Sequence, residues 1–304
     1  MNKNYIIENI KDFHLRDVLE CGQCFHFERI DSGINPDEFE YEIVAKDRIL
    51  RIKEEPDSEG VRLTFFNTEK WEYDTVWKDY FDLDRDYAEI KGYIIEADPR
   101  LEDIIYENSG IRILNQDFFE TLISFIISQN KQIPQIKQVV KNLSSELGSK
   151  FDITMFDRPD LEFDAFFPTP EQLNLASEDE IRSSKCGFRA PYIKDAAEKV
   201  YNGEITLEML SKLDTDEARE VLMSIHGVGE KVANCVLLFG LGRREAFPVD
   251  VWMKRICEYM YYDEADTPKA IIEEDARKRF GKYAGYAQQY LFMYGQKHKI
   301  GIKR

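Results

Sequence analysis

The chain has 304 residues, a length that suggests about two domains of roughly 150 residues each. Hydrophobic residues make up 43% of it and aromatic residues 13%, which supplies a substantial core and excludes a disordered or fibrous protein. The net charge is −17, but residues 221–304 carry 14 Lys and Arg against 10 Asp and Glu. The overall charge therefore does not exclude a polyanion that binds to this C-terminal part of the chain.

The beginning of the chain predicts neither export nor membrane insertion. Its first ten residues, MNKNYIIENI, lack the apolar core of a signal peptide. No apolar run approaches the roughly 18 residues that a membrane helix needs. Five cysteines, an odd number, fit a reducing compartment better than a disulfide framework. We therefore expect an intracellular protein without membrane contact, in the cytoplasm or nucleoid if it is prokaryotic.

The first hundred residues alternate apolar and polar side chains, as strands with one solvated face do. Lys46 and Asp47 separate two of these runs and are typical of a tight turn. We expect an antiparallel, twisted β-sheet domain over residues 1–98, in which 82–98 cross over to the next domain. The expected strands are Cys24–Ile30, Tyr41–Ala45, Arg48–Lys53 and Val61–Phe65.

From about Leu101 onward the apolar period becomes helical. Pro134 is well placed to begin a helix, and Gly148 to end it after Leu147. Residues 99–304 therefore predict an all-α domain, which makes the fold class α+β. The expected helices are 118–127, 134–147, a short one after the cap Thr169, 191–201, 214–224, 231–241, 251–259, one from Thr267-Pro268, and 283–294.

The most informative segment is a hairpin between two expected helices, at about residues 214–241. Gly227 and Gly229 flank a single valine, and glycine permits both positive φ and close backbone approach. The free N–H groups at the start of the second helix can bind a phosphate. A plain helical hairpin with no ligand is common and is the favoured interpretation of Gly-x-Gly alone, so the phosphate site depends on further signals in the sequence.

A second polar residue follows the hairpin at a defined spacing. Asp250 ends the loop RREAFPVD and precedes an expected helix, where a carboxylate usually serves as the N-cap. It comes 19 residues after Lys231, a separation that can return the chain to the start of the helix that carries this lysine. An amine and a carboxylate at one helix end suggest chemistry beyond capping.

These residues resemble a known signature. The run HGVGEKVA at 226–233, followed by PVD at 248–250, is similar to the helix-hairpin-helix, Gly/Pro-loop and aspartate signature of DNA base-excision glycosylases. Within this superfamily the chain resembles the 8-oxoguanine DNA glycosylase/lyase family. Further matching motifs, in the same order, are CGQCF at 21–25, SQN at 128–130, GFRAPY at 187–192, YAGYAQ at 283–288 and LF at 291–292.

The resemblance implies a bifunctional enzyme that flips 8-oxoguanine out of duplex DNA. Lys231 would be the nucleophile that attacks C1′, displaces the base and leaves an imine, which permits strand cleavage by β-elimination. Asp250 would stabilise the positive charge that develops on the sugar, while it also caps its helix. A lone helical lysine is normally just solvated, so the catalytic assignment depends on the motif.

Four residues would bind the extruded base by the same resemblance. The Gly22 carbonyl would accept a hydrogen bond from N7–H, a proton that guanine lacks. Phe292 and Cys235 would face the base from opposite sides, and Gln288 would bind its Watson–Crick edge. Without the family, core packing is the simpler interpretation of Phe292 and Cys235, and a turn glycine that of Gly22.

Other residues would hold the duplex. Asn130 matches the residue that fills the hole left by the base, and Arg189 an arginine that contacts the opposite base. Gln135 stands where eukaryotic members have a second, cytosine-reading arginine, so we expect a relaxed opposite-base preference. Backbone amides of Gly227, Gly229 and Val232 would bind phosphate.

The resemblance implies no cofactor, apart from a monovalent cation that the hairpin carbonyls can hold. The last cysteine is Cys257, so the four closely spaced C-terminal cysteines of an iron–sulfur cluster are absent from the sequence. Cys21-x-x-Cys24 lacks the second pair of a zinc site. We expect no metal site.

Two competing functions are an alkylated-base glycosylase and a non-catalytic helix-hairpin-helix DNA-binding protein. The first kind of enzyme generally lacks the hairpin lysine, and phosphate binding alone needs neither Lys231 nor Asp250. We therefore expect a monomeric repair enzyme whose partner is double-stranded DNA that contains 8-oxoguanine.

Overall fold

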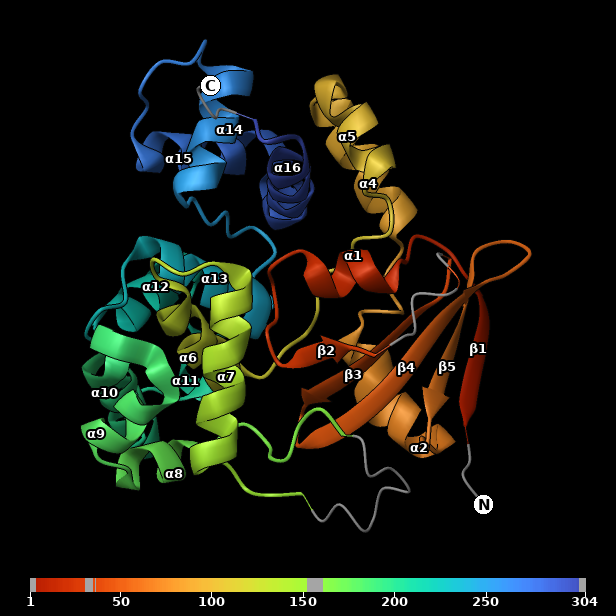
Figure 1. Cartoon of the computed structure of the whole chain (residues 1–304). Coiled ribbons are helices and arrows are strands. Elements are labelled where there is room, and N and C mark those ends of the chain that lie inside the picture. The colour runs from red at the N-terminus through yellow and green to blue at the C-terminus, as the bar shows by residue number, and fades with distance from the viewer. Residues whose placement is uncertain (1–3, 31–34, 36, 152–160, 301–304) are drawn as a thin grey trace.

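The computed structural model describes residues 4–30, 35, 37–151 and 161–300. Its N-terminal part is a five-stranded antiparallel sheet with the strand order β1-β5-β4-β3-β2 (Figure 1). A helical region follows, which confirms the α+β fold class. The strands are β1 (Tyr5–Ile10), β2 (Phe27–Arg29), β3 (Phe39–Ala45), β4 (Arg48–Pro56) and β5 (Val61–Phe66).

The hairpin between β3 and β4 forms as the alternation predicts. Ala45 pairs with Arg48, and the two residues between them, Lys46 and Asp47, both have φ of +53°. Two consecutive positive φ values are the mark of the two-residue turn that matches strand twist. On β4, Leu50 and Ile52 are fully buried and form part of the core under the sheet.

The expected strand over Cys24–Ile30 is wrong in its first half. The strand β2 covers Phe27–Arg29, and the flanking His26 carbonyl and Ile30 N–H also bond to β3, whereas the chain before His26 crosses to the helical region. There the Phe25 ring lies 5.6 Å from that of Phe125, in an edge-to-face contact. β1 and the short helix α1 (Leu15–Glu20) were not expected from the sequence.

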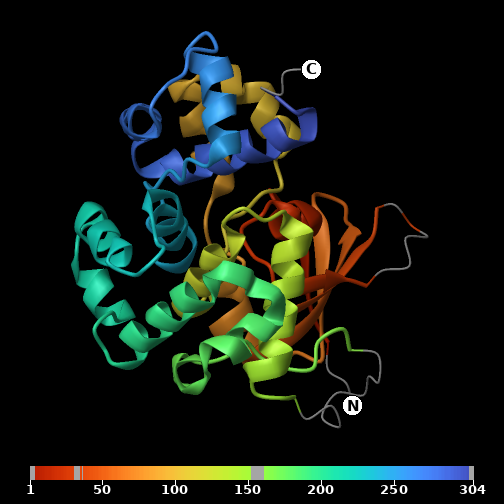
Figure 2. The same cartoon turned by 60° about the vertical axis from the view of Figure 1, so that its left-hand side comes forward.

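The helices form two groups beside the sheet (Figures 1 and 2). α6 and α13 pack together in one group, and α4 and α5 join α14–α16 in the other. The bounds are α2 (Lys70–Glu72), α3 (Lys78–Tyr80), α4 (Tyr87–Ala97), α5 (Glu102–Glu107), α6 (Phe118–Ser128), α7 (Ile133–Leu147), α8 (Pro170–Leu175), α9 (Glu178–Ile181), α10 (Ala190–Tyr201), α11 (Leu207–Lys212), α12 (Thr215–Met223), α13 (Glu230–Gly240), α14 (Val251–Tyr261), α15 (Lys269–Phe280) and α16 (Ala284–His298).

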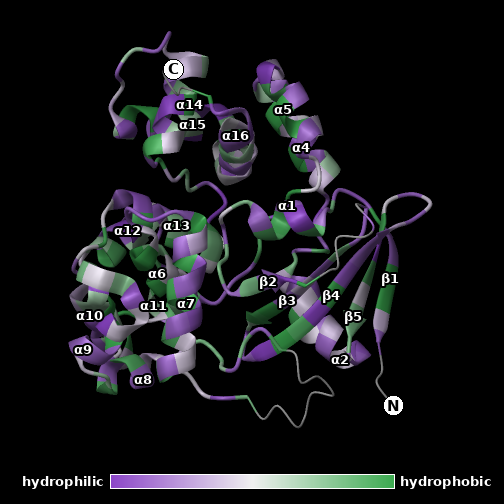
Figure 3. Ribbon diagram, viewed as in Figure 1, coloured by the Kyte–Doolittle hydropathy of each residue, from purple (hydrophilic) through white to green (hydrophobic). Residues whose placement is uncertain are grey.

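The helix signals in the sequence are confirmed where caps are clear. Gly148 ends α7, and Thr169 caps α8 by accepting the N–H of Gln172 at 3.2 Å. α6 and α13 pack against each other, and most residues of the two helices are buried in the core of the helical region, where hydrophobic segments of ribbon gather in Figure 3. Within the ranges that the structure describes, no helix is both long and apolar enough to cross a membrane.

A buried carboxylate on the sheet holds the start of α1. Glu54 of β4 is 3% exposed, and its Oε2 accepts a hydrogen bond from the Leu15 N–H. Its Oε1 lies 3.4 Å from Nδ1 of His14. Burial raises the pKa of Glu54 to about 7 and lowers the pKa of His14. Burial therefore favours the uncharged form of both side chains.

This arrangement predicts that Glu54→Gln is more stable than the parent at high pH. Because the folded pKa lies above the usual 4.5, folding favours the protonated acid, and stability is lost as pH rises from about 4.5 to 7. Glutamine mimics the protonated acid and presents an N–H to His14. We expect about 1–3 kcal/mol of extra stability at pH 8 and almost none at pH 4.5.

Urea unfolding at several pH values measures this difference. Glu55→Gln removes the same charge from the next position of β4 and serves as the matched control. Parallel stability curves for Glu54→Gln and the parent between pH 4.5 and 8 would refute the assignment.

Candidate active site

The hairpin between α12 and α13 is shaped by its first glycine. Gly227 has φ of +80°, and an added Cβ would lie 2.4 Å from a ring carbon of Tyr192, so only glycine fits. Gly229 is the extended N-cap of α13, and the first backbone bond of the helix runs from Ala233 N–H to the Gly229 carbonyl. The N–H groups at the start of α13, that of Val232 included, are therefore directed outward.

Lys231 lies in the first turn of α13 and is half-buried. Its Nζ donates a hydrogen bond to Ser128 Oγ at 3.1 Å and lies 4.9 Å from the ring centroid of Phe125. Ser128, the last residue of α6, donates its own proton to the Phe125 carbonyl at 2.8 Å. Its oxygen is thereby turned toward the lysine, which is held in one position. Ser128 belongs to the motif SQN at 128–130, but the sequence alone predicted no role for it.

Asp250 caps α14, as its place before the helix predicts. Its Oδ1 accepts the Met253 N–H at 2.7 Å. The cap needs one carboxylate oxygen and fixes the position of the other. Asp250 and Lys231 both line one pocket.

This pocket, about 470 Å³ in volume, lies between the N-terminal region and the helices. Gly22 lines it from the turn after α1, with φ of +80°, and a Cβ there would lie 3.3 Å from Cε1 of Phe292. The structure therefore brings together Gly22, Lys231, Asp250 and Phe292. The other lining residues are Phe25, Phe125, Ser128, Lys131, Gln132, Ile133, Pro134, Ile136, Trp252, Gln296 and Lys299.

Two expected base-binding residues are buried and are not among the residues that line this pocket. Cys235 lies one turn beyond Lys231 on α13 and is 3% exposed. Burial raises the pKa of its thiol to about 11, against the opposing effect of the nearby Lys231 charge. Gln288 is 4% exposed, and its Oε1 accepts a hydrogen bond from Gln289 Nε2 at 2.8 Å. Base contact by these two residues stays a prediction.

The residues expected at the opposite base flank the α6–α7 turn. Asn130 is exposed with φ of +51°. Arg189 is 4% exposed, and burial lowers its pKa. Its guanidinium donates to the carbonyls of Gln129 and Cys186. Gln135 accepts the Gln132 N–H at 3.1 Å in the capping box of α7. Its amide therefore stabilises the helix start.

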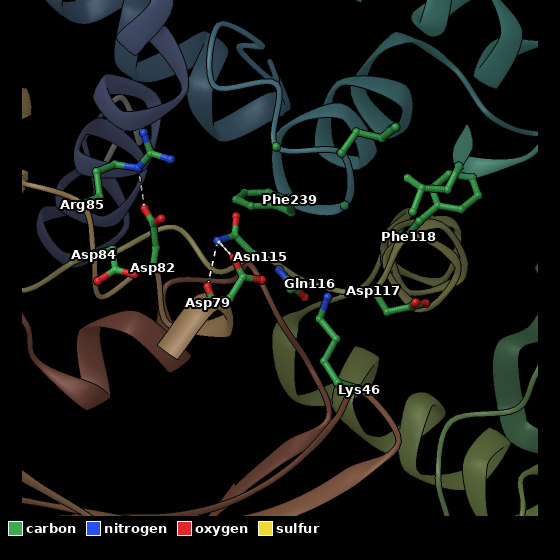
Figure 4. Close-up of a pocket in the computed structure, with 14 residues that line it drawn as sticks. Lys46, Asp79, Asp82, Asp84, Arg85, Asn115, Gln116, Asp117, Phe118 and Phe239 are labelled. Carbon is green, nitrogen blue, oxygen red and sulfur yellow. Dashed lines mark hydrogen bonds and ion pairs between the residues drawn. The ribbon is translucent and has the colours of Figure 1, made fainter. Parts of the chain in front are cut away.

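A larger cavity, about 650 Å³ in volume, lies at the other end of α13 (Figure 4). Four aspartates line it, with Lys46 and Arg85 as the cations: Asp79, Asp82, Asp84 and Asp117. Such a lining repels DNA phosphates. The smaller pocket beside Lys231 is therefore the candidate active site.

Comparison with known proteins matches both halves of the chain. Residues 5–122 match the family model described as "8-oxoguanine DNA glycosylase, N-terminal domain". Residues 123–282 match the model "HhH-GPD superfamily base excision DNA repair protein". A "Probable N-glycosylase/DNA lyase" of Methanothermobacter thermautotrophicus is 31% identical over 71% of this chain and 73% of its own length.

Two solved structures are similar over nearly the whole chain. One is "MBOgg1 in complex with low affinity DNA ligand", which is 40% identical with a TM-score of 0.88, over 98% of this chain and 99% of that one. The other is the Clostridium acetobutylicum 8-oxoguanine glycosylase/lyase, in complex with double-stranded DNA containing cytosine opposite 8-oxoG. It is 36% identical with a TM-score of 0.87, over 99% of each chain.

Proposed function

Because the chain belongs to the 8-oxoguanine DNA glycosylase family of the HhH-GPD superfamily, we propose that it excises 8-oxoguanine from duplex DNA and then cuts the strand. The proposal depends on one observation above all, that Lys231 and Asp250 line the same pocket as Gly22 and Phe292. The partner of the protein is duplex DNA, so we propose that it acts inside the cell.

Lys231 provides the nucleophile for both reactions. The lone pair of its neutral Nζ attacks C1′ of the flipped nucleotide, and the C1′–N9 bond breaks with its electron pair going to the base. The nitrogen loses a proton and the sugar ring opens to an imine. Loss of a C2′ proton then expels the 3′ phosphate, and water hydrolyses the imine to free the lysine.

Asp250 contributes by electrostatic stabilisation and forms no covalent bond to the substrate. The carboxylate is fixed by the Met253 N–H, so it needs no reorganisation when positive charge develops on the sugar. The outward N–H groups at the start of α13 hold a phosphate of the same strand. The carboxylate lies at the start of α14 and the N–H groups at the start of α13, the helix that also carries Lys231, so the bound strand is aligned with the lysine.

The two competing functions explain the site less well. Enzymes that remove alkylated bases generally lack a lysine at the position of Lys231, and a DNA-binding scaffold needs no carboxylate beside its phosphate site. In this chain the lysine donates a hydrogen bond to Ser128 and lines a pocket that is large enough to hold a base.

Borohydride trapping tests the function directly. The protein is mixed with duplexes that carry 8-oxoguanine, 3-methyladenine or guanine at one position, and the imine is reduced to a stable adduct. An adduct with 8-oxoguanine DNA alone supports the proposal. Release of 3-methyladenine without an adduct favours the alkylated-base enzyme, and binding without any reaction favours the scaffold.

The chain should excise 8-oxoguanine opposite adenine almost as readily as opposite cytosine. Arginine only donates hydrogen bonds and suits the acceptors of cytosine, whereas Gln135 both donates and accepts. The capping box also holds the Gln135 amide. Gln135→Arg should restore a cytosine preference of roughly tenfold to a hundredfold, because a discriminating contact is worth about 1–3 kcal/mol.

Single-turnover excision from four duplexes that differ only in the opposite base measures this preference. Gln138→Arg adds the same charge to α7 one turn later and is the matched control. A cytosine preference of several hundredfold in the parent would contradict the prediction, and would assign the discrimination to Arg189 alone.

A further inference from the structure

The Gly22 backbone has little to hold it in place locally. α1 has only six residues and ends at Glu20, with Cys21 as its C-cap, and Gly22 has no side chain to pack. Its φ is +80°, and because glycine has no Cβ it can adopt other turn conformations at little cost. Under the proposed function, its carbonyl must nevertheless be positioned accurately enough to accept a hydrogen bond from N7–H of the base.

The next residue, Gln23, uses all of its amide groups in hydrogen bonds. It is fully buried, and its Nε2 donates to the carbonyls of Val18, at 2.7 Å, and Arg112, at 2.8 Å. Its Oε1 accepts the Leu114 N–H at 2.9 Å. One side chain thus links α1 to residues 112–116, about ninety positions away in sequence.

The segment 112–116 continues this connection to α13. The Gln116 side chain donates from Nε2 to the Gln23 carbonyl at 2.7 Å, and its backbone N–H donates to the Phe239 carbonyl at 3.1 Å. Figure 4 shows Gln116 and Phe239 beside each other at the edge of the acidic cavity. Phe239 lies near the end of α13, the helix that carries Lys231 in its first turn.

We propose that Gln23 is the positioning residue that fixes the Gly22 carbonyl relative to Lys231, through segment 112–116. This inference rests on the proposed function. It makes the selectivity of the enzyme for 8-oxoguanine depend on Gln23. Every amide group of Gln23 is satisfied by backbone atoms, so its loss leaves buried polar groups unpaired and lets the Gly22 turn shift.

Such a shift affects the two reactions of the enzyme differently. Excision of 8-oxoguanine requires the Gly22 carbonyl at N7–H, where a single hydrogen bond distinguishes the base from guanine. Cleavage at an abasic site requires Lys231 but no base contact. The ratio of the two rates therefore reports the position of Gly22 and not the general integrity of the fold.

The test compares Gln23→Met and Gln116→Met with the parent protein. Gln116 is half-buried, and methionine there removes only the bond to the Gln23 carbonyl, so this variant is usable if Gln23→Met does not fold. Single-turnover excision of 8-oxoguanine and β-elimination at an abasic site are measured on the same duplex. Leu173→Ala, a core truncation in α8, controls for lost stability.

We expect the excision rate to fall by roughly tenfold to a hundredfold in Gln23→Met, because small misplacements carry this cost. It should fall less in Gln116→Met, and abasic cleavage should be unchanged in both. The ratio should not move in Leu173→Ala. Equal losses in both reactions, or no loss in either, would overturn the proposal. A parent that cuts abasic DNA but never releases 8-oxoguanine would instead refute the proposed function.

Discussion

Replacing Lys231 by glutamine is expected to lower strand cleavage by roughly a factor of 10⁴ or more, as removal of a nucleophile does. Glutamine keeps a polar end that can still bind Ser128, the partner of the lysine amine. An amide nitrogen has no lone pair available for attack at C1′. DNA binding should largely remain, because backbone amides and other cations hold the phosphates.

Borohydride adducts and the binding constant are measured on the same 8-oxoguanine duplex. Lys131→Gln is the matched control, because Lys131 lines the same pocket and the change removes the same charge but leaves the reactive amine. An adduct yield at the parent level in Lys231→Gln would exclude Lys231 as the nucleophile.

Asp250→Asn is expected to slow the chemical step by roughly 10²- to 10³-fold, with little change in DNA affinity. Asparagine is as good an N-cap as aspartate, so the bond from Met253 and the start of α14 should persist. What disappears is the negative charge that faces the sugar. The loss should therefore appear in single-turnover rates and not in thermal stability.

Asp214 provides the matched control for this substitution. It caps α12 by accepting the Glu217 N–H at 2.8 Å, at the start of the hairpin that carries Lys231, but it does not line the pocket. Asp214→Asn should leave the chemical rate unchanged. An unchanged single-turnover rate in Asp250→Asn would reduce Asp250 to a helix cap.

Sequence patterns predicted the parts of the fold that are encoded locally. The β3–β4 turn at Lys46 and Asp47 and the end of α7 at Gly148 are set by neighbouring residues. β1 was missed because its outer residues are apolar too, with Ile6 51% exposed, so it shows no clean alternation. α1 is too short for a helical period to appear.

The site was only partly predictable for a related reason. Motifs named Lys231, Asp250, Gly22 and Phe292, and the structure places all four around one pocket. The contacts of Gln23 join segments about ninety residues apart, and no local pattern encodes such a pair. The same holds for the bond between Lys231 and Ser128.

The pocket is completed by residues from the two ends of the chain, Gly22 near its start and Phe292 near its finish. During translation Lys231 is therefore synthesised before Phe292, the residue that completes the lining of the pocket. A nascent or truncated chain that already carries the reactive amine has no complete base pocket. The lining of this pocket is therefore complete only once α16, which carries Phe292, has been added to the chain.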